Sequence, residues 1–196
     1  MGALLDAGKL SANGAVIAEP GDGGVIVGHR GMCFVQLTTL GRAAHASMPE
    51  NGVNAVEAMV DVLQACRTLR LSHTAHPLLG SPTVAVGTTI SGGERPNVVP
   101  DACAATLDVR TVPDMSRDSV VAGIRAHLER CGIAEERQPD VEVRIWGEPG
   151  VTDPAAEIAL VTAQAFAREF GYDPESGPGR QRRTAGGSRA VPRFLL

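Results

Sequence analysis

The sequence has 196 residues and a mass of 20.4 kDa, which is enough for one large or two small domains. Hydrophobic residues make up 43% and charged residues 20%, a composition that argues against an intrinsically disordered chain. Aromatic residues make up only 3% and the net charge is −4, so we expect no nucleic-acid partner, because such surfaces need stacking side chains and a basic face.

The two ends of the chain differ in composition from the rest. No apolar run approaches the roughly 18 residues of a membrane span, and the N-terminus lacks the basic and apolar regions of a signal peptide. We therefore expect a cytoplasmic protein with no membrane partner. Residues 174–196 are rich in Gly, Pro and Arg and show no periodicity, and the last 17 residues carry five arginines and no acid. This composition predicts a disordered tail.

The four cysteines are far apart in the sequence and form no C-x-x-C pair. Without such spacing, neither a metal site nor a redox motif is indicated. We expect reduced thiols that behave as small buried hydrophobic residues: Cys33, Cys66, Cys103 and Cys131.

The spacing of apolar residues changes in a regular order along the chain. A short apolar run at 15–18 predicts a buried strand of a parallel sheet. After it, spacings of two, typical of strands, alternate with spacings of three and four, typical of amphipathic helices. They predict a strand at 32–40, a helix at 53–69, strands at 83–90 and 103–111, a helix from its cap Ser116 to Cys131, and a strand at 141–146. In this last strand Ile145 should share the face of Val141 and Val143, and Trp146 should lie on the opposite face.

This β-α-β-β-α-β order predicts an α+β fold of the ferredoxin-like type, in which both helices cover one face of a four-stranded antiparallel sheet. The other face is free, and an edge strand is available for pairing across a dimer. A strand precedes this module, and a helix beginning at Asp153 and Pro154 follows it. We therefore expect the module to be inserted into an α/β domain.

Two candidate site residues lie near predicted strand ends. Glu19 follows the apolar run at 15–18, where open α/β sheets place ligands, and its carboxylate could bind a metal or be a solvated loop residue. His45 stands among small residues, so its imidazole is accessible and could donate a hydrogen bond to a developing oxyanion. A surface or capping histidine fits the same pattern.

Two further candidates lie in and after a turn that is rich in Gly and Pro. Asn97 could present a donor and an acceptor to an amide, or belong to a plain hairpin loop. Arg110 could clamp a carboxylate with two hydrogen bonds, or pair within the chain with Asp108 or Glu142. A histidine pair at 73 and 76 has no acidic third ligand nearby, so we expect solvated loop residues there.

Five short motifs resemble one family in the right order: VIAEP at 16–20, HRG at 29–31, GRAAHASMP at 41–49, GGERPNVVP at 92–100 and DVR at 108–110. The family is that of the dinuclear zinc amidohydrolases, which includes acetylornithine deacetylase, succinyl-diaminopimelate desuccinylase, aminoacylase and glutamate carboxypeptidase. The resemblance implies two zinc ions and the hydrolysis of N-acyl amino acids or peptides that carry a free carboxylate. It also implies that the βαββαβ unit is the lid that forms a homodimer.

The resemblance also implies roles for the four candidates. Glu19 matches a zinc ligand, and His45 matches the lid histidine that reaches the partner subunit's active site and stabilises the tetrahedral intermediate. Asn97 matches a substrate-binding residue of the lid. Arg110 matches the arginine that holds the substrate carboxylate.

The chain departs from the family in its metal ligands. The family places a His-x-Asp motif, a bridging Asp and a Glu-Glu pair before the position of Glu19, but only 18 residues precede Glu19 in this sequence. The family also places a last His ligand near the C-terminus, and residues 180–196 contain no His. A zinc site needs three or more protein ligands. We therefore expect a fragment that does not hold zinc and is inactive alone, so whether the chain is itself an enzyme stays open.

The expected organisation follows from the lid assignment. Residues 1–28 would end a truncated catalytic α/β domain, 29–147 would form the lid, 148–173 would return to the catalytic domain as a helix, and 174–196 would be the tail. Two alternatives stay open: a non-catalytic homodimerisation module, and a ferredoxin-like domain that binds RNA or an amino-acid effector.

Overall fold

The computed structural model describes residues 7–8, 11, 13–20, 24–171 and 192–195. These residues divide into two compact units: residues 30–149, and the flanking residues of 1–29 and 150–196. Among the described residues, no helix is long and apolar enough to cross a membrane.

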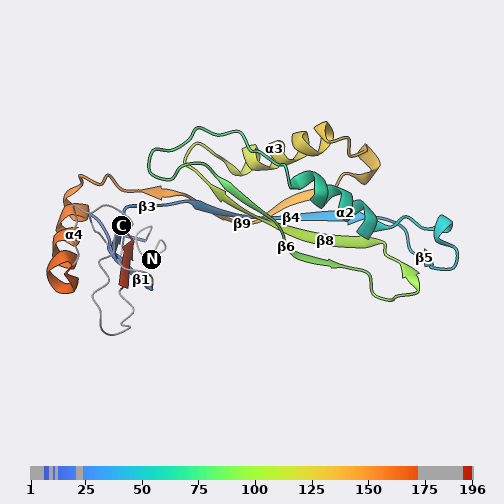
Figure 1. Ribbon diagram of the computed structural model, residues 1–196, viewed down its shortest axis with the longest axis horizontal. Coiled ribbons are helices and arrows are strands. Elements are labelled where there is room, and N and C mark those ends of the chain that lie inside the picture. Colours follow the sequence, from blue (N-terminus) through green and yellow to red (C-terminus); the bar gives the residue numbers. More distant parts are fainter. Residues whose placement is uncertain (1–6, 9–10, 12, 21–23, 172–191, 196) are drawn as a thin grey trace. The chain divides into compact units, whose positions relative to one another are not determined.

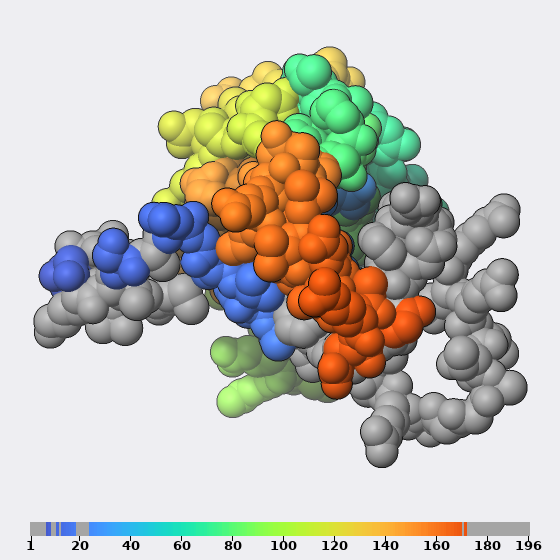
Figure 2. Space-filling view, turned by 90° about the vertical axis from the view of Figure 1, so that its left-hand side faces the viewer, coloured from blue at the N-terminus to red at the C-terminus, as the bar shows by residue number. Residues whose placement is uncertain are grey.

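The central unit is an antiparallel sheet covered on one face by two helices. Its strands follow the order β6-β8-β4-β9, so β6 and β9 are the edges. Figure 1 shows both helices above the sheet, and in the end-on view of Figure 2 the green surface of the loop after α2 lies near the top. The elements are β4 (Gly31–Leu40), α2 (Ala55–Cys66), β6 (Thr83–Gly92), β8 (Ala102–Thr111), α3 (Arg117–Arg130) and β9 (Asp140–Gly147).

The sequence prediction of a mixed fold with an antiparallel sheet is confirmed. Alternate residues of β4 and β8 face the helices and are buried, as the spacing of two requires. Burying each large side chain of this kind contributes about 1.5–3 kcal/mol. The fully buried side chains include Val35, Leu37, Leu107, Met59, Val62, Ile124 and Leu128.

Side-chain caps set where the two helices begin. The Asn54 side chain accepts hydrogen bonds from the backbone N–H groups of Val56 and Glu57, so α2 starts two residues later than the predicted range. Ser116 caps α3 as predicted, in a reciprocal capping box with Ser119.

The face assignment of the last strand was wrong at two residues. A register shift opposite Phe34 and Val35 makes Arg144 an extra residue in β9. Beyond this bulge the alternation is inverted, so Ile145 lies 43% exposed while Trp146 packs against the core. The apolar spacing alone could not reveal the bulge, because it arises from pairing with β4.

The cysteine prediction was wrong at one position. Cys33, Cys66 and Cys103 are buried free thiols, but Cys131 is exposed, because α3 ends at Arg130 and Cys131 is its C-cap. His127 is buried in the turn before this end instead. Its Nε2 lies 2.9 Å from the carbonyl oxygen of Ala65, so the ring donates to α2 and joins the two helices.

We expect alkylation to separate these thiols. Burial raises the pKa of Cys33 and of Cys66 to about 11, which leaves little reactive thiolate. Cys131 is exposed and is therefore accessible to the reagent. Iodoacetamide should modify Cys131 alone in the folded chain and all four thiols after unfolding, as mass spectrometry of peptides would show. Cys131→Ser should take up no label when folded; early labelling of Cys33 would contradict the buried assignment.

The flanking unit contains short strands and one helix. β1 (Ile17–Pro20), β11 (Pro192–Leu195) and β2 (Gly24–Ile26) form a sheet in the order β1-β11-β2, with β1 antiparallel and β2 parallel to β11. β3 (Gly28–His29) pairs with β10 (Gly150–Val151). Helix α4 (Glu157–Phe170) ends at Gly171, whose φ of 66° suits a residue without a side chain.

Three predictions for this unit need correction. The apolar run at 15–18 is no buried strand of a parallel sheet: β1 is antiparallel to its neighbour, and Ile17 is 44% exposed. The helix begins at Glu157, because the Asp153 side chain accepts from the N–H of Ala155 in a turn before the helix instead of capping it. Within the predicted disordered tail, residues 192–195 form β11, and 174–191 and 196 lie outside the described residues.

Candidate functional site

The tip of the central unit, residues 41–54 and 92–101, holds two of the four predicted site residues. β5 (Ala44–His45) follows β4 and pairs with β7 (Val98–Val99) beyond the end of the main sheet (Figure 1). His45 lies opposite Val98, and the N–H of Ala46 donates to the carbonyl oxygen of Asn97 at 2.9 Å. The structure therefore brings His45 and Asn97 together.

The tip is closely packed at the backbone. A side chain at Gly52 would lie 2.9 Å from Cγ1 of Val99 and 3.0 Å from the carbonyl oxygen of Arg42, so only glycine fits there. The short 3-10 helix η1 (Pro49–Asn51) precedes it. This packing holds the two loops of the tip in one arrangement.

The His45 side chain is exposed and hydrogen-bonded at one nitrogen. Its Nδ1 accepts the backbone N–H of Ser47 at 3.2 Å and lies 2.7 Å from the Ser47 hydroxyl oxygen. Because a backbone N–H can only donate, Nδ1 carries the lone pair and the proton of the neutral ring is on Nε2. The exposed edge of His45 is thus a hydrogen-bond donor.

A groove of about 580 Å³ runs along the tip; it is lined by sequence neighbours of His45 and Asn97, such as Ala46 and Pro96, but not by these two residues themselves. It lies between the loop before α2 and the β6–β7 connection, so both site-bearing loops form its walls. Its lining includes Ala46, Pro49, Asn54, Val56, Glu94 and Arg95.

Arg110 lies far from the tip on the face of the sheet opposite the helices. Its Nη2 donates to Oδ2 of Asp108 at 2.8 Å, so the intrachain pair that the sequence left open is present. Asp108 engages one nitrogen of the guanidinium and leaves other donors for a ligand. Arg110 lies eight residue steps along β8 from Ala102 at the tip end, which is about 27 Å.

Glu19 belongs to the flanking unit, in β1, where its backbone lies opposite Arg193. Its side chain lies outside the described part of the structure. The described residues contain no group of three or more His, Cys, Asp or Glu side chains that could hold a metal ion. These residues therefore do not form the zinc site that the sequence resemblance implies.

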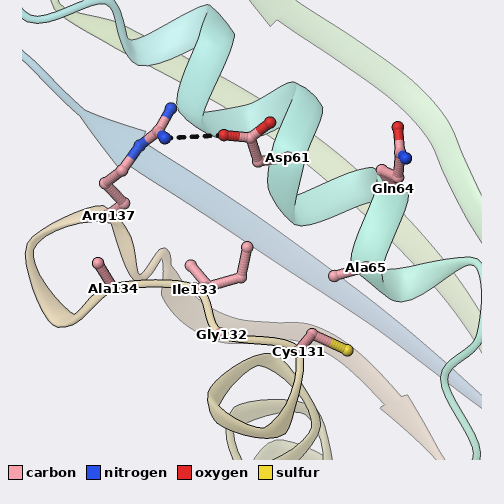
Figure 3. Close-up of a pocket in the computed structure, with 8 residues that line it drawn as sticks. All are labelled: Asp61, Gln64, Ala65, Cys131, Gly132, Ile133, Ala134 and Arg137. Atoms are coloured by element: carbon pink, nitrogen blue, oxygen red, sulfur yellow. Dashed lines mark ion pairs between the residues drawn. The ribbon is translucent and has the colours of Figure 1, made fainter.

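A second cavity, of about 440 Å³, lies between α2 and the segment after α3 (Figure 3). An ion pair of 2.8 Å between Arg137 and Asp61 borders it, and the exposed thiol of Cys131 lines it. None of the four predicted site residues lines this cavity, whereas two of them, His45 and Asn97, lie in the tip. We therefore place the candidate site at the tip.

Ser47 is a residue of the site that was not predicted from the sequence. The signal that could have indicated it is a hydroxyl residue two positions after a histidine in a tight turn. Such side chains often form hydrogen bonds with groups two residues away. His127 was passed over as well, although it falls at helical spacing from the buried Val120 and Ile124.

Comparison with known proteins identifies the family. A family model described as a peptidase dimerisation domain matches residues 27–134, more than half of the chain. The chain therefore belongs to the M20 peptidase dimerisation domain family, which confirms the resemblance seen in the motifs.

Curated relatives agree with this assignment. The chain is 26% identical over 148 residues to a succinyl-diaminopimelate desuccinylase from Roseobacter denitrificans, covering 76% of this chain and 38% of that protein. It is 34% identical over 119 residues to an acetylornithine deacetylase from Vibrio parahaemolyticus, covering 58% of this chain and 31% of that protein. The chain thus spans about a third of the length of these relatives.

Solved structures share the fold. An aminopeptidase from Bacillus cereus superposes with a TM-score of 0.57 at 20% identity, covering 91% of this chain and 46% of that one. The dipeptidase Dug1p from Saccharomyces cerevisiae gives a TM-score of 0.57 at 14% identity, covering 76% and 42%. At these identities the similarity concerns the fold alone.

Proposed function

We propose that the chain carries the ferredoxin-like lid and dimerisation domain of a metal-dependent amidohydrolase that cleaves N-acyl amino acids or peptides with a free carboxylate. The observation that carries this proposal is the tip, where β5 and β7 bring His45 and Asn97 together and leave a donor exposed on His45. The strand order β6-β8-β4-β9, with both helices on one face, supports the ferredoxin-like assignment.

In this proposal the units have separate tasks. Residues 29–147 are the lid, and 1–28 and 148–173 are parts of a catalytic domain. The two zinc ions that such a hydrolase uses would be bound by Glu19, whose side chain is not described, together with ligands that are not among the described residues. Because the described residues hold no metal cluster, we expect the chain alone to hydrolyse no N-acetyl or N-succinyl amino acid when zinc is added.

The lid residues have roles that need no metal of their own. The Nε2–H of His45 would donate to the oxyanion that develops when the amide carbonyl is attacked. The Asn97 amide would bond the substrate amide group. Arg110, held by Asp108, would bind the substrate carboxylate through its remaining guanidinium donors.

The distance along β8 supports a homodimer. One small substrate cannot span the roughly 27 Å between the tip and Arg110 of the same chain. His45 and Arg110 can therefore serve the same substrate only if they come from two subunits. A dimer in which each tip reaches the partner's site meets this requirement.

The edge strand β6 offers the surface for such a dimer. Val56, Val60 and Leu63 form a stripe along α2, and Val56 and Leu63 lie next to Gly92 and Gly87 of β6. Val60 and Ile90, between these contacts, are 52% and 55% exposed. We name Val56, Val60, Leu63 and Ile90 the apolar strip. An exposed apolar surface beside an unpaired strand edge is typical of an interface.

A lid exchange tests the function. Residues 30–149 would replace the matching segment of the Vibrio parahaemolyticus acetylornithine deacetylase, whose own catalytic domain supplies the metal site. We expect the chimera to hydrolyse N-acetylornithine, because the tip and Arg110 complete the site. A folded, dimeric chimera that binds metal but lacks all turnover would favour the non-catalytic dimerisation module.

A further inference from the structure

We propose that Ser47 is a positioning residue that fixes the tautomer and the orientation of the His45 ring. This inference rests on the proposed role of His45 as a donor to an oxyanion. It assigns a task to a residue that neither the motif nor the predicted roles of the site single out.

Both hydrogen bonds of the ring come from Ser47. The backbone N–H donates to Nδ1 at 3.2 Å, and the hydroxyl oxygen lies 2.7 Å from the same nitrogen. Because Nδ1 already accepts from the N–H, the hydroxyl must donate its proton to this nitrogen as well. A proton on Nδ1 could be accepted by the hydroxyl oxygen, but it would face the backbone N–H and break that bond. Ser47 therefore favours the ring with its proton on Nε2.

The tip fixes the backbone of His45 but not its ring. The N–H of Met48 donates to the carbonyl oxygen of His45 at 2.9 Å, which closes a turn, and the N–H of Ala46 donates to Asn97. Within the described chain, no other residue forms a hydrogen bond with the His45 ring, and the side chain is exposed. Rotation of this exposed ring is thus limited by Ser47.

The tautomer decides what the outer edge of the ring can do. With the proton on Nε2, the edge donates to a negative oxygen; with the proton on Nδ1, the edge presents a lone pair and repels it. A donor that is already oriented does not have to reorganise during the reaction. Ser47 would therefore act through His45 without touching the substrate.

The ¹⁵N NMR spectrum of the His45 ring in the full chain tests this proposal. At about pH 8.5, where an ordinary imidazole is neutral, the wild-type ring should show a protonated Nε2 and an unprotonated, hydrogen-bonded Nδ1. Ser47→Ala removes the hydroxyl but keeps the backbone N–H, so Nε2 should stay protonated while the motion of the ring increases. Ser47→Thr keeps the hydroxyl and should restore the wild-type spectrum.

Ser91→Ala is the matched control, because Ser91 is an exposed serine of β6 outside the tip. Its spectrum should equal that of the wild type. If the wild-type ring carries its proton on Nδ1, or if Ser47→Ala leaves the ring motion unchanged, the proposal is wrong. The measurement uses no substrate or metal, so its outcome is separate from that of the lid exchange, which tests the hydrolase function.

Discussion

Replacing His45 with alanine in the chimeric deacetylase is expected to lower kcat by about 100- to 1,000-fold and to change KM little. An oriented donor to a developing oxyanion contributes this much in hydrolases, and it acts in the transition state and not in the bound substrate. His45 suits this role because its Nδ1 is occupied by Ser47 and its Nε2–H is exposed at the tip. Steady-state kinetics with N-acetylornithine would measure the loss.

Two variants control this result. His73→Ala removes an exposed histidine of the loop after α2, whose Nδ1 donates to the Leu71 carbonyl, and should leave kcat unchanged. His45→Gln keeps a side-chain donor and should recover part of the activity. Equal losses in His45→Ala and His73→Ala would point to damage of the lid as a whole and would remove His45 from the site.

Mixing two inactive variants would show whether His45 acts on the partner's substrate. Chimeras with His45→Ala and with Arg110→Ala should each be nearly inactive as homodimers. In a mixed dimer, one of the two sites keeps both His45 and Arg110, provided that each site takes these two residues from different subunits. After random exchange about a quarter of the full activity should return, because half of the dimers are mixed and each has one intact site. No recovery would place both residues of a site in one chain.

Local patterns were sufficient to predict the main elements of the central unit. The spacing of two in β4 and β8 and the cap at Ser116 depend on residues close in the sequence, and each is confirmed. The bulge at Arg144 depends instead on how β9 pairs with β4, and it reversed the predicted faces of Ile145 and Trp146. Pairing of this kind has no local sequence signal.

The sequence motifs predicted the residues of the site, but they did not predict how these residues are arranged in space. Two-residue strands such as β5 and β7 exist only because distant segments pair, so no pattern in either segment predicts that His45 meets Asn97. The partner of Arg110 was open between Asp108 and Glu142, since both alternate to the same face. The register settles it, because Arg110 lies opposite Met32 and Glu142 lies opposite Gln36, where it pairs with Arg144. Ser47 became visible only once the turn placed its N–H at the His45 ring.

The apolar strip is expected to hold two chains together, and Val60→Glu should convert the dimer to a monomer. Val60 is 52% exposed, so the change should spare the core while placing a charge in the centre of the interface. A charge buried without a partner at such a position costs at least about 2 kcal/mol. In a twofold dimer each substitution counts twice, so the dissociation constant should rise roughly 1,000-fold. Sedimentation equilibrium of the full chain would measure the change.

The control lies on the opposite edge of the same sheet. Ile145 of β9 is also an exposed apolar residue, and the Arg144–Glu142 ion pair and the bulge beside it make that edge unsuitable for strand pairing. Ile145→Glu should therefore leave the dimer intact. If Ile145→Glu dissociates the dimer and Val60→Glu does not, the chains pair through β9. A different dimer arrangement would then have to bring the tip to the partner's Arg110. A wild-type chain that stays monomeric at every concentration would contradict the proposed homodimer itself.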